Sequence, residues 1–447
     1  MSSGPRNRRV AAATTTATRG SLLGVSLAYF LVLLDTTVLT VALPGIRADL
    51  GGSVAGQQWV VNGYTVSFAA FLLGGGALAD RFGPLRVFRW GVASFGVLSL
   101  VSAFAPNLTV LVVLRVLLGV AGAACLPSSL ALISRLHPDP AARAKALGAW
   151  AAITGVALAA GPIAGGLLVD LADWRAVFLV NVPLAALGLA LTRGRETAPA
   201  GRGFDVRSQL AACVSLGLLT EAIVDAQPVA AVLALLVLAL FVHRERRSAA
   251  PSVPPVLVRS RGVAVNLFAG AAVNFVLSGA LLAVTLLLQD ERHLTPVETG
   301  LAFLPLTLPT AFNPLLTSRI VAARGPRLPV VAGLTLLTAG AVVVAATVHA
   351  PYPLLACGLL LLGLGVSLAL PALVACVVTA APDGYAGTAG GLLNAVRQVG
   401  ATVGVAAMGA VVATGAFGWA FVLAAAVPAS GQLLSFCQRN SNSSAHL

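Results

Sequence analysis

Apolar residues along this chain are gathered into fourteen long runs, which are separated by short segments rich in charged residues, glycine and proline. A helix of about 20 residues is about 30 Å long, which matches the hydrocarbon core of a bilayer. The pattern therefore predicts an all-α integral membrane protein with fourteen transmembrane helices. The runs cover residues 21–44, 57–78, 87–105, 108–133, 146–169, 174–192, 208–225, 228–243, 263–288, 299–318, 328–348, 353–378, 386–412 and 416–436.

Composition supports a membrane protein and limits how it is powered. Hydrophobic residues make up 58% of the chain and charged residues 10%, whereas soluble domains carry about 25% charged residues. The sequence contains no G-x-x-x-x-G-K-[ST] stretch, so ATP binding by a P-loop is excluded. We therefore expect no cofactor, and an ion gradient as the energy source. No pair of acids, histidine cluster or nucleophile with a base lies at one membrane depth, which argues against an enzyme.

Basic residues are distributed unevenly between the two sets of connecting segments. With both termini in the cytoplasm, 23 of the 28 basic residues fall in cytoplasmic segments, and three fall outside: Arg47, Arg175 and Arg292. Because arginine is retained on the cytoplasmic side, this asymmetry predicts a multi-pass protein of the cell membrane with both termini inside. It also argues against a nucleic-acid partner, since the basic charge is spread over many loops.

Four charged residues lie inside the apolar runs: Asp35, Arg115, Glu221 and Arg397. Such a charge costs about 3 kcal/mol on insertion scales and usually faces a bundle interior or a water-filled cavity. Asp35 lies about nine residues, or about 14 Å, from the outer end of its run, and Arg115 lies at a similar depth. We expect these two to pair; a structural charge that faces other polar groups is the alternative for Arg115. Glu221 is best explained as an acid that reaches the membrane surface from a peripheral helix.

A weak internal repeat divides the chain into two halves. Residues 74–88 and 317–330 both end in a Gly-Pro turn followed by an arginine, as in transporters built from related six-helix halves. We predict an N-terminal tail (1–20), a six-helix bundle (21–192), two inserted helices (193–262), a second bundle (263–436) and a C-terminal tail (437–447).

Several stretches of the first 190 residues resemble one family, the fourteen-span drug:proton antiporters of the major facilitator superfamily. The stretch that contains Trp174 and Asn181 is interpreted as an interfacial anchor and a cap. The stretches are LDTTV (34–38) running to ALP (42–44), GALADRFG (76–83), RVLLGVAGAA (115–124), the segment from Gly155 to Gly166, and Trp174-Arg175 with Phe178 and Asn181-Val182-Pro183. The resemblance implies two six-helix bundles plus two central helices.

The same resemblance implies roles for individual residues. Asp35 would be the protonatable site that exchanges a proton for substrate, because burial favours the neutral form of a carboxyl group; an acid that merely reaches the surface is the bland alternative. Asp80 and Arg81 would gate the conformational change and Gly83 would permit the tight turn, although Pro84-Leu85 replaces the family's usual basic residues. The antiporter motif would comprise Gly155, Gly161, Pro162, Gly165 and Gly166, for which a plain small-residue packing seam is the alternative.

Polar residues of several runs are candidates for lining a substrate cavity. Asn394, Arg397 and Gln398 match a family pattern in the thirteenth run, and Arg397 would face Asp35 from the opposite half. The other cavity candidates are Asn62, Tyr64, Asn274 and Asn313.

These predictions combine into one function. We expect a monomeric, proton-coupled exporter of drugs, antibiotics or other small hydrophobic or cationic compounds, which works by alternating access in the lipid bilayer. An importer or facilitator of a small metabolite is the alternative within the same fold.

Overall fold

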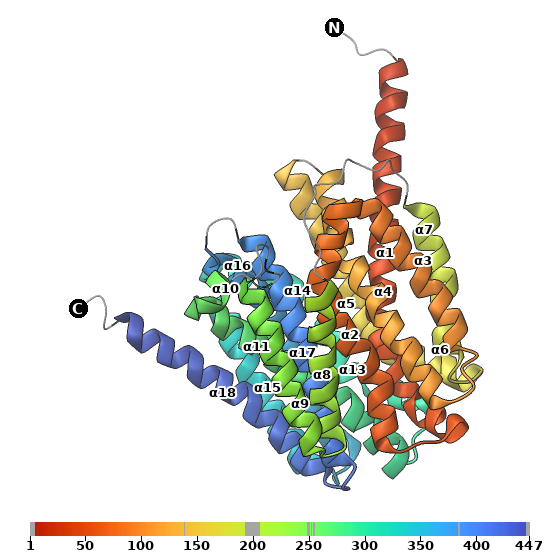
Figure 1. Ribbon diagram of the computed structural model, residues 1–447, viewed down its shortest axis with the longest axis vertical. Coiled ribbons are helices and arrows are strands. Elements are labelled where there is room, and N and C mark those ends of the chain that lie inside the picture. Colours follow the sequence, from red (N-terminus) through yellow and green to blue (C-terminus); the bar gives the residue numbers. More distant parts are fainter. Residues whose placement is uncertain are drawn as a thin grey trace.

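The computed structural model describes residues 5–137, 139–192, 206–247, 251, 253, 255–382 and 385–443. Within these residues every regular element is a helix. Each of the fourteen apolar runs coincides with one or more helices, so the helical pattern was predictable from hydrophobicity alone. The long axis of the molecule runs roughly along most of these helices (Figure 1).

The described residues of the N-terminal half form seven helices. The first continues through Pro44 to Leu50, beyond the end of the first apolar run, and its N-terminal part projects out of the bundle (Figure 1). The helices are α1 (Pro5–Leu50), α2 (Val54–Phe82), α3 (Pro84–Ser102), α4 (Leu108–Leu136), α5 (Pro140–Leu171), α6 (Ala176–Leu179) and α7 (Asn181–Leu191).

Two helices lie between the halves in the sequence, and the elements after them form the C-terminal half. The inserted helices are α8 (Val206–Val224) and α9 (Pro228–Arg247). The C-terminal elements are α10 (Pro255–Arg259), α11 (Arg261–Leu286), the π-helix η1 (Leu287–Glu291), α12 (Pro296–Ala302), α13 (Leu304–Phe312), α14 (Pro314–Arg324), α15 (Arg327–Thr347), α16 (Tyr352–Ala380), α17 (Ala386–Val412) and α18 (Phe417–Ser443).

The tenth apolar run, 299–318, is divided among three helices instead of forming one. α13 carries Pro305 in its first turn and Pro309 inside it, and α14 begins at Pro314. Proline has no N–H to donate and its ring clashes with the preceding turn, so closely spaced prolines interrupt a helix. The apolar pattern predicted a single continuous span here, and the prolines explain why the run is segmented instead.

Nine helices of the described residues are long and apolar enough to cross a membrane. Three shorter apolar helices lie at 159–171, 176–191 and 417–432. The protein is therefore a multi-pass membrane protein, and the count of fourteen spans stays a prediction.

The two halves use the same helix packing. In the N-terminal half, α5 approaches α1 at Gly161 and Gly165; in the C-terminal half, α17 approaches α11 at Gly400 and Gly404. A Cβ atom at any of these four glycines would collide with the facing helix. Small residues spaced four apart let two membrane helices come into close contact, and both halves use this device.

The most extensive contacts between the halves are those of α2 with α17 and of α5 with α12 and α13. The inserted helix α8 contacts both α2 and α17, while α9 lies beside α8 (Figure 1). The inserted pair therefore covers one of the seams between the halves.

Candidate functional site

The N-terminal half encloses an ion pair between Asp35 on α1 and Arg115 on α4. An Oδ2 atom of Asp35 lies 2.5 Å from Nη1 of Arg115, and each side chain is only 1% exposed. A buried pair of this kind is costly to break, because either partner alone would be an uncompensated charge in a medium of low polarity. The two helices are thus tied together at the depth where the apolar runs placed both charges.

Asn181 of α7 and Ser99 of α3 complete the surroundings of the carboxylate. Asn181 donates an Nδ2 hydrogen bond of 2.9 Å to Oδ1 of Asp35, and the same Nδ2 lies 3.3 Å from Oγ of Ser99. Asn181 and Ser99 are fully buried. Hydrogen bonds from an arginine and an amide both stabilise the charged carboxylate.

The guanidinium of Arg115 is held from its other side by α2. Its Nε donates to the carbonyl of Val60 at 3.0 Å, and the guanidinium carbon lies 4.6 Å from the centre of the Tyr64 ring. The hydroxyl of Tyr64 donates in turn to the carbonyl of Val32 on α1. Cation–π contact and hydrogen bonds together fix the arginine. The cluster therefore joins α1, α2 and α4 through one buried arginine.

Asn62 and Tyr64, two of the expected cavity residues, are both fully buried. Tyr64 packs beneath Arg115, and the Oδ1 of Asn62 accepts a hydrogen bond from Thr65, whose hydroxyl also contacts Thr402 of α17. They lie in the interior because α2 is covered by α4 on one side and by α17 on another. In this conformation both side chains are enclosed by neighbouring helices.

Arg397 on α17 belongs to a second polar group, in the C-terminal half. Its Nε donates to Oδ1 of Asn274 at 3.2 Å and its Nη1 donates to Oδ1 of Asn394 at 3.1 Å. None of the ion pairs within the described residues includes Arg397. Its expected position opposite Asp35 is not a contact here, because Asp35 is enclosed by its own half. Gln398 lies half-buried on the same helix.

Glycines of the antiporter motif serve two contacts at once. Gly161 and Gly165 face α1, at Thr37 and Val38, whereas Gly166 faces Pro296 of α12. Gly300 of α12 in turn faces the backbone of Pro162. α5 is therefore clamped between its own half and the other half. The surroundings of Gly155 are outside the part of the chain that the structure describes.

The segment after α2 shows why Gly83 stands there. Gly83 ends α2 and begins α3 with φ at +91°, a conformation that side chains rarely adopt, and its N–H bonds to the carbonyl of Ala79. Arg81 is exposed and its guanidinium lies over the ring of Phe82. The side chain of Asp80 lies outside the described residues, so the gating role of both charges stays a prediction.

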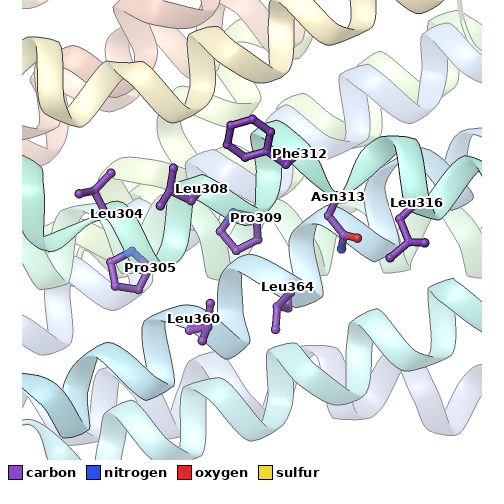
Figure 2. Close-up of a pocket in the computed structure, with 9 residues that line it drawn as sticks. All are labelled: Leu304, Pro305, Leu308, Pro309, Phe312, Asn313, Leu316, Leu360 and Leu364. Carbon is purple, nitrogen blue, oxygen red and sulfur yellow. The ribbon is translucent and has the colours of Figure 1, made fainter.

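Asn313 and Glu221 lie apart from both polar groups. Asn313 lines an apolar hollow of about 460 Å³ between the α13–α14 segment and Leu360 and Leu364 of α16 (Figure 2). Its amide donates to Oγ of Ser367 at 2.8 Å. Glu221 is half-buried on α8 of the inserted pair.

The partners of Asp35 in α3 and α7 were not predicted. The resemblance implies a structural, capping role for Asn181 in the stretch that begins at Trp174-Arg175. Its position within an apolar run is a signal in the sequence, since a polar amide buried in such a run needs a hydrogen-bond partner. Ser99 gave no signal, because a serine can satisfy its hydroxyl within its own helix. No group of three or more His, Cys, Asp or Glu side chains in the described residues is placed to hold a metal ion.

Comparison with known proteins agrees with this architecture. The sequence profile of the Major Facilitator Superfamily matches residues 25–405. The chain is 35% identical over 405 residues to the multidrug resistance protein Stp of Mycobacterium tuberculosis, covering 88% of this chain and 75% of that protein. It is 37% identical over 407 residues to the puromycin resistance protein pur8 of Streptomyces alboniger, covering 87% and 80%.

A solved structure shows the same fold at much lower identity. The crystal structure of a POT family transporter in complex with 5-aminolevulinic acid matches with a TM-score of 0.70 and 12% identity, covering 93% of this chain and 95% of that one. Together with the profile match and the relatives above, this shows that the chain belongs to the Major Facilitator Superfamily.

Proposed function

We propose that this protein is a proton-coupled exporter of drugs, antibiotics or other small molecules, and that Asp35 is its proton site. The observation that carries the proposal is the buried ion pair of Asp35 with Arg115, joined by Asn181. A titratable acid enclosed at such a cost inside a membrane bundle is a functional site by default. The names of the relatives, which are resistance proteins, support export of toxic compounds.

The proposed topology rests on the arginine asymmetry. The protein spans the cell membrane fourteen times as a monomer, with both termini in the cytoplasm. The end of the bundle at which α1 finishes is then external. Three contacts between the halves lie there: Arg47 with Asp290 at 3.1 Å, Gln289 with the carbonyl of Val41 at 3.0 Å, and Asp170 with the backbone N–H of Val297 at 3.3 Å.

These contacts support a conformation that is closed to the outside. In the proposed cycle, substrate binds from the cytoplasm while Asp35 is charged and paired with Arg115. The external contacts then open, a proton from outside neutralises Asp35, and Arg115 loses its partner. Substrate leaves to the outside, and the protonated carrier returns and releases its proton to the cytoplasm. α2 and α5, which contact the opposite half, would move against it during these steps.

The deciding experiment is Asp35→Asn in a host that lacks the gene. The host is exposed to a panel of antibiotics and dyes with the wild-type gene, the variant or an empty vector, and retained compound is measured with and without a proton uncoupler. The wild type should lower accumulation of at least one compound until the uncoupler is added. Asp35→Asn should accumulate as much as the empty vector.

The matched control is Asp225→Asn, an exposed acid after α8, which should export normally. Uncoupler-sensitive efflux by Asp35→Asn at the wild-type rate would exclude Asp35 as the proton site. Higher accumulation with the gene than without it would instead identify an importer.

A further inference from the structure

The C-terminal polar group carries a positive charge that lacks an acidic partner within the described part of the chain. Arg397 donates to two neutral amides, those of Asn274 and Asn394, which use two of the five N–H donors of a guanidinium. Its partners leave the charge itself uncompensated, whereas Arg115 is neutralised by Asp35. A partly buried cation inside a membrane bundle is expensive unless an anion completes it. The unused donors point to an acceptor that the described residues do not supply.

An aromatic pair from the other half lies beside this cation. Tyr29 of α1 and Trp150 of α5 stack with their ring centres 4.7 Å apart and their planes 12° apart. Tyr29 is close enough to Arg397 for the two groups to interact electrostatically, and α1 contacts α11, which carries Asn274. The cation and the aromatic pair therefore lie near each other on helices of opposite halves.

One hydrogen-bond donor of this place is also unused. Nε1 of Trp150 is buried and has no partner among the described residues. A buried indole N–H normally finds an acceptor. The group thus offers a cation that two amides hold in place, an unused indole N–H and an aromatic surface. All of its donors suit an oxygen-rich acceptor.

We propose that Arg397, Asn394, Tyr29 and Trp150 bind a planar aromatic molecule that carries an acidic oxygen group, such as a carboxylate or an acidic phenol. The aromatic pair stacks on the ring system, and Arg397 binds the acidic oxygen through its free donors. This inference rests on the proposed function, because it names the substrate class of the same exporter. It replaces the cationic substrates expected from Asp35 alone, since Asp35 is already paired with Arg115 and the remaining mid-membrane charge is positive.

The geometry also explains how binding would sense the conformational cycle. Tyr29 and Trp150 belong to the N-terminal half, whereas Arg397, Asn274 and Asn394 belong to the C-terminal half. Movement of one half against the other separates the stacking surface from the cation. The site is therefore assembled in the conformation seen here and weakened in the opposite one.

The test compares three probes that share one ring system and differ in charge. Binding of 9-anthracenecarboxylate, 9-anthracenecarboxamide and 9-(aminomethyl)anthracene to the purified full chain is measured by fluorescence anisotropy, against protein-free micelles. The wild type should bind the carboxylate at least about tenfold more tightly than the amine. No variant is needed for this comparison, so it holds even where a substitution prevents folding. Equal affinities for carboxylate and amine would overturn the proposal.

Two substitutions then locate the site. Arg397→Gln should weaken the carboxylate about 10- to 100-fold and leave the carboxamide nearly unchanged, because only the charge-assisted bond is lost. Trp150→Ala should weaken all three probes several-fold through loss of stacking. The controls are Arg324→Gln at an exposed helix end and Trp419→Ala on the surface of α18, which should bind like the wild type. Equal weakening of all three probes by Arg397→Gln would show a structural role instead.

A transport measurement separates this inference from the proposed function. If Asp35→Asn abolishes proton-driven export but the wild type shows no preference for the carboxylate, the exporter assignment stands and the substrate class is wrong. If the wild type prefers the carboxylate but its transport ignores the proton gradient, the binding site stands and proton coupling fails. If Arg397→Gln changes proton dependence without changing the order of the probes, Arg397 is a partner of Asp35 in another conformation and the site is refuted.

Discussion

The two halves of this protein share a scaffold and differ in how they treat a buried arginine. In each half, a glycine-rich helix packs tightly on the first helix of the bundle, at Gly161 in one half and Gly400 in the other. Arg115 of the N-terminal half is neutralised by Asp35, while Arg397 of the C-terminal half is held by two amides alone. The packing is repeated, whereas the charge balance is not.

Under the proposed function, this difference separates the two tasks of a proton-coupled exporter. A closed, neutral cluster can take up a proton only by giving up its internal ion pair, which makes it suited to coupling. A cation left incomplete can accept an anionic group without first breaking a bond to an acid. Our two proposals therefore assign the proton to the N-terminal half and the acidic group of the substrate to the C-terminal half.

The largest effect that tests this contrast comes from removing each arginine. Arg115→Leu leaves Asp35 buried without its ion-pair partner and should destabilise the protein by about 3–5 kcal/mol. Arg397→Leu leaves only two amide oxygens without donors and should cost about 1–3 kcal/mol. The apparent melting temperature of the purified protein in detergent should therefore fall much further for Arg115→Leu. Equal losses would show that both clusters are merely structural.

A double replacement serves as the control for this experiment. Asp35→Leu combined with Arg115→Leu removes both charges, so it should be more stable than Arg115→Leu alone, because no uncompensated charge remains. The double variant should still fail in transport, since it has lost the proposed proton site. A double variant as unstable as the single one would indicate that packing, and not charge, dominates this position.

The shared scaffold gives a second and smaller effect. A valine at Gly161 or at Gly400 would push apart the helices that meet there, and should cost about 1–3 kcal/mol in either half. The functional outcomes should differ: Gly161→Val displaces α1 and with it Asp35, whereas Gly400→Val displaces α11 and with it Asn274. Transport assays and anthracenecarboxylate binding distinguish the two. Gly217→Val, at a glycine with open space around it, is the matched control.

Hydrophobic pattern and charge placement made much of this predictable. The fourteen apolar runs located the helices because membrane helices need long apolar stretches, and depth counting placed Asp35 and Arg115 at one level because helical rise is constant. The division of the tenth run at Pro305, Pro309 and Pro314 follows from local proline chemistry. Hydrophobicity alone does not predict it, because a proline changes backbone hydrogen bonding without interrupting an apolar run.

Other features depend on contacts between distant segments and could not be read from the pattern. Tyr64 was expected in a cavity, yet it lies beneath Arg115, because the rotation of α2 is set by its packing against α4 and α17. The bond of Asn181 to Asp35 joins residues 146 positions apart. The stack of Tyr29 on Trp150 likewise requires the α1–α5 contact. Such pairings arise from tertiary packing, which a single sequence does not specify.

The smallest predicted effect concerns the Arg47–Asp290 ion pair, which links the halves at the end of the bundle where α1 finishes. Arg47 and Asp290 are partly exposed, with side chains 34% and 27% accessible, so their pair is worth about 1 kcal/mol at most and is screened by salt. Arg47→Gln should raise the population that is open at this end by no more than about fivefold at low salt.

Spin labels placed at Leu171→Cys and His349→Cys, one in each half, report this population by distance measurement, with the exposed Cys357 replaced by serine. At high salt the wild type should approach the variant, because an exposed ion pair is screened. The Asp35–Arg115 pair should be insensitive to added salt, since ions from solution do not reach a pair that is 1% exposed. If added salt destabilised the buried pair as much as it opened this end, the N-terminal cluster would be open to water, and the contrast between a closed and an open arginine would fail.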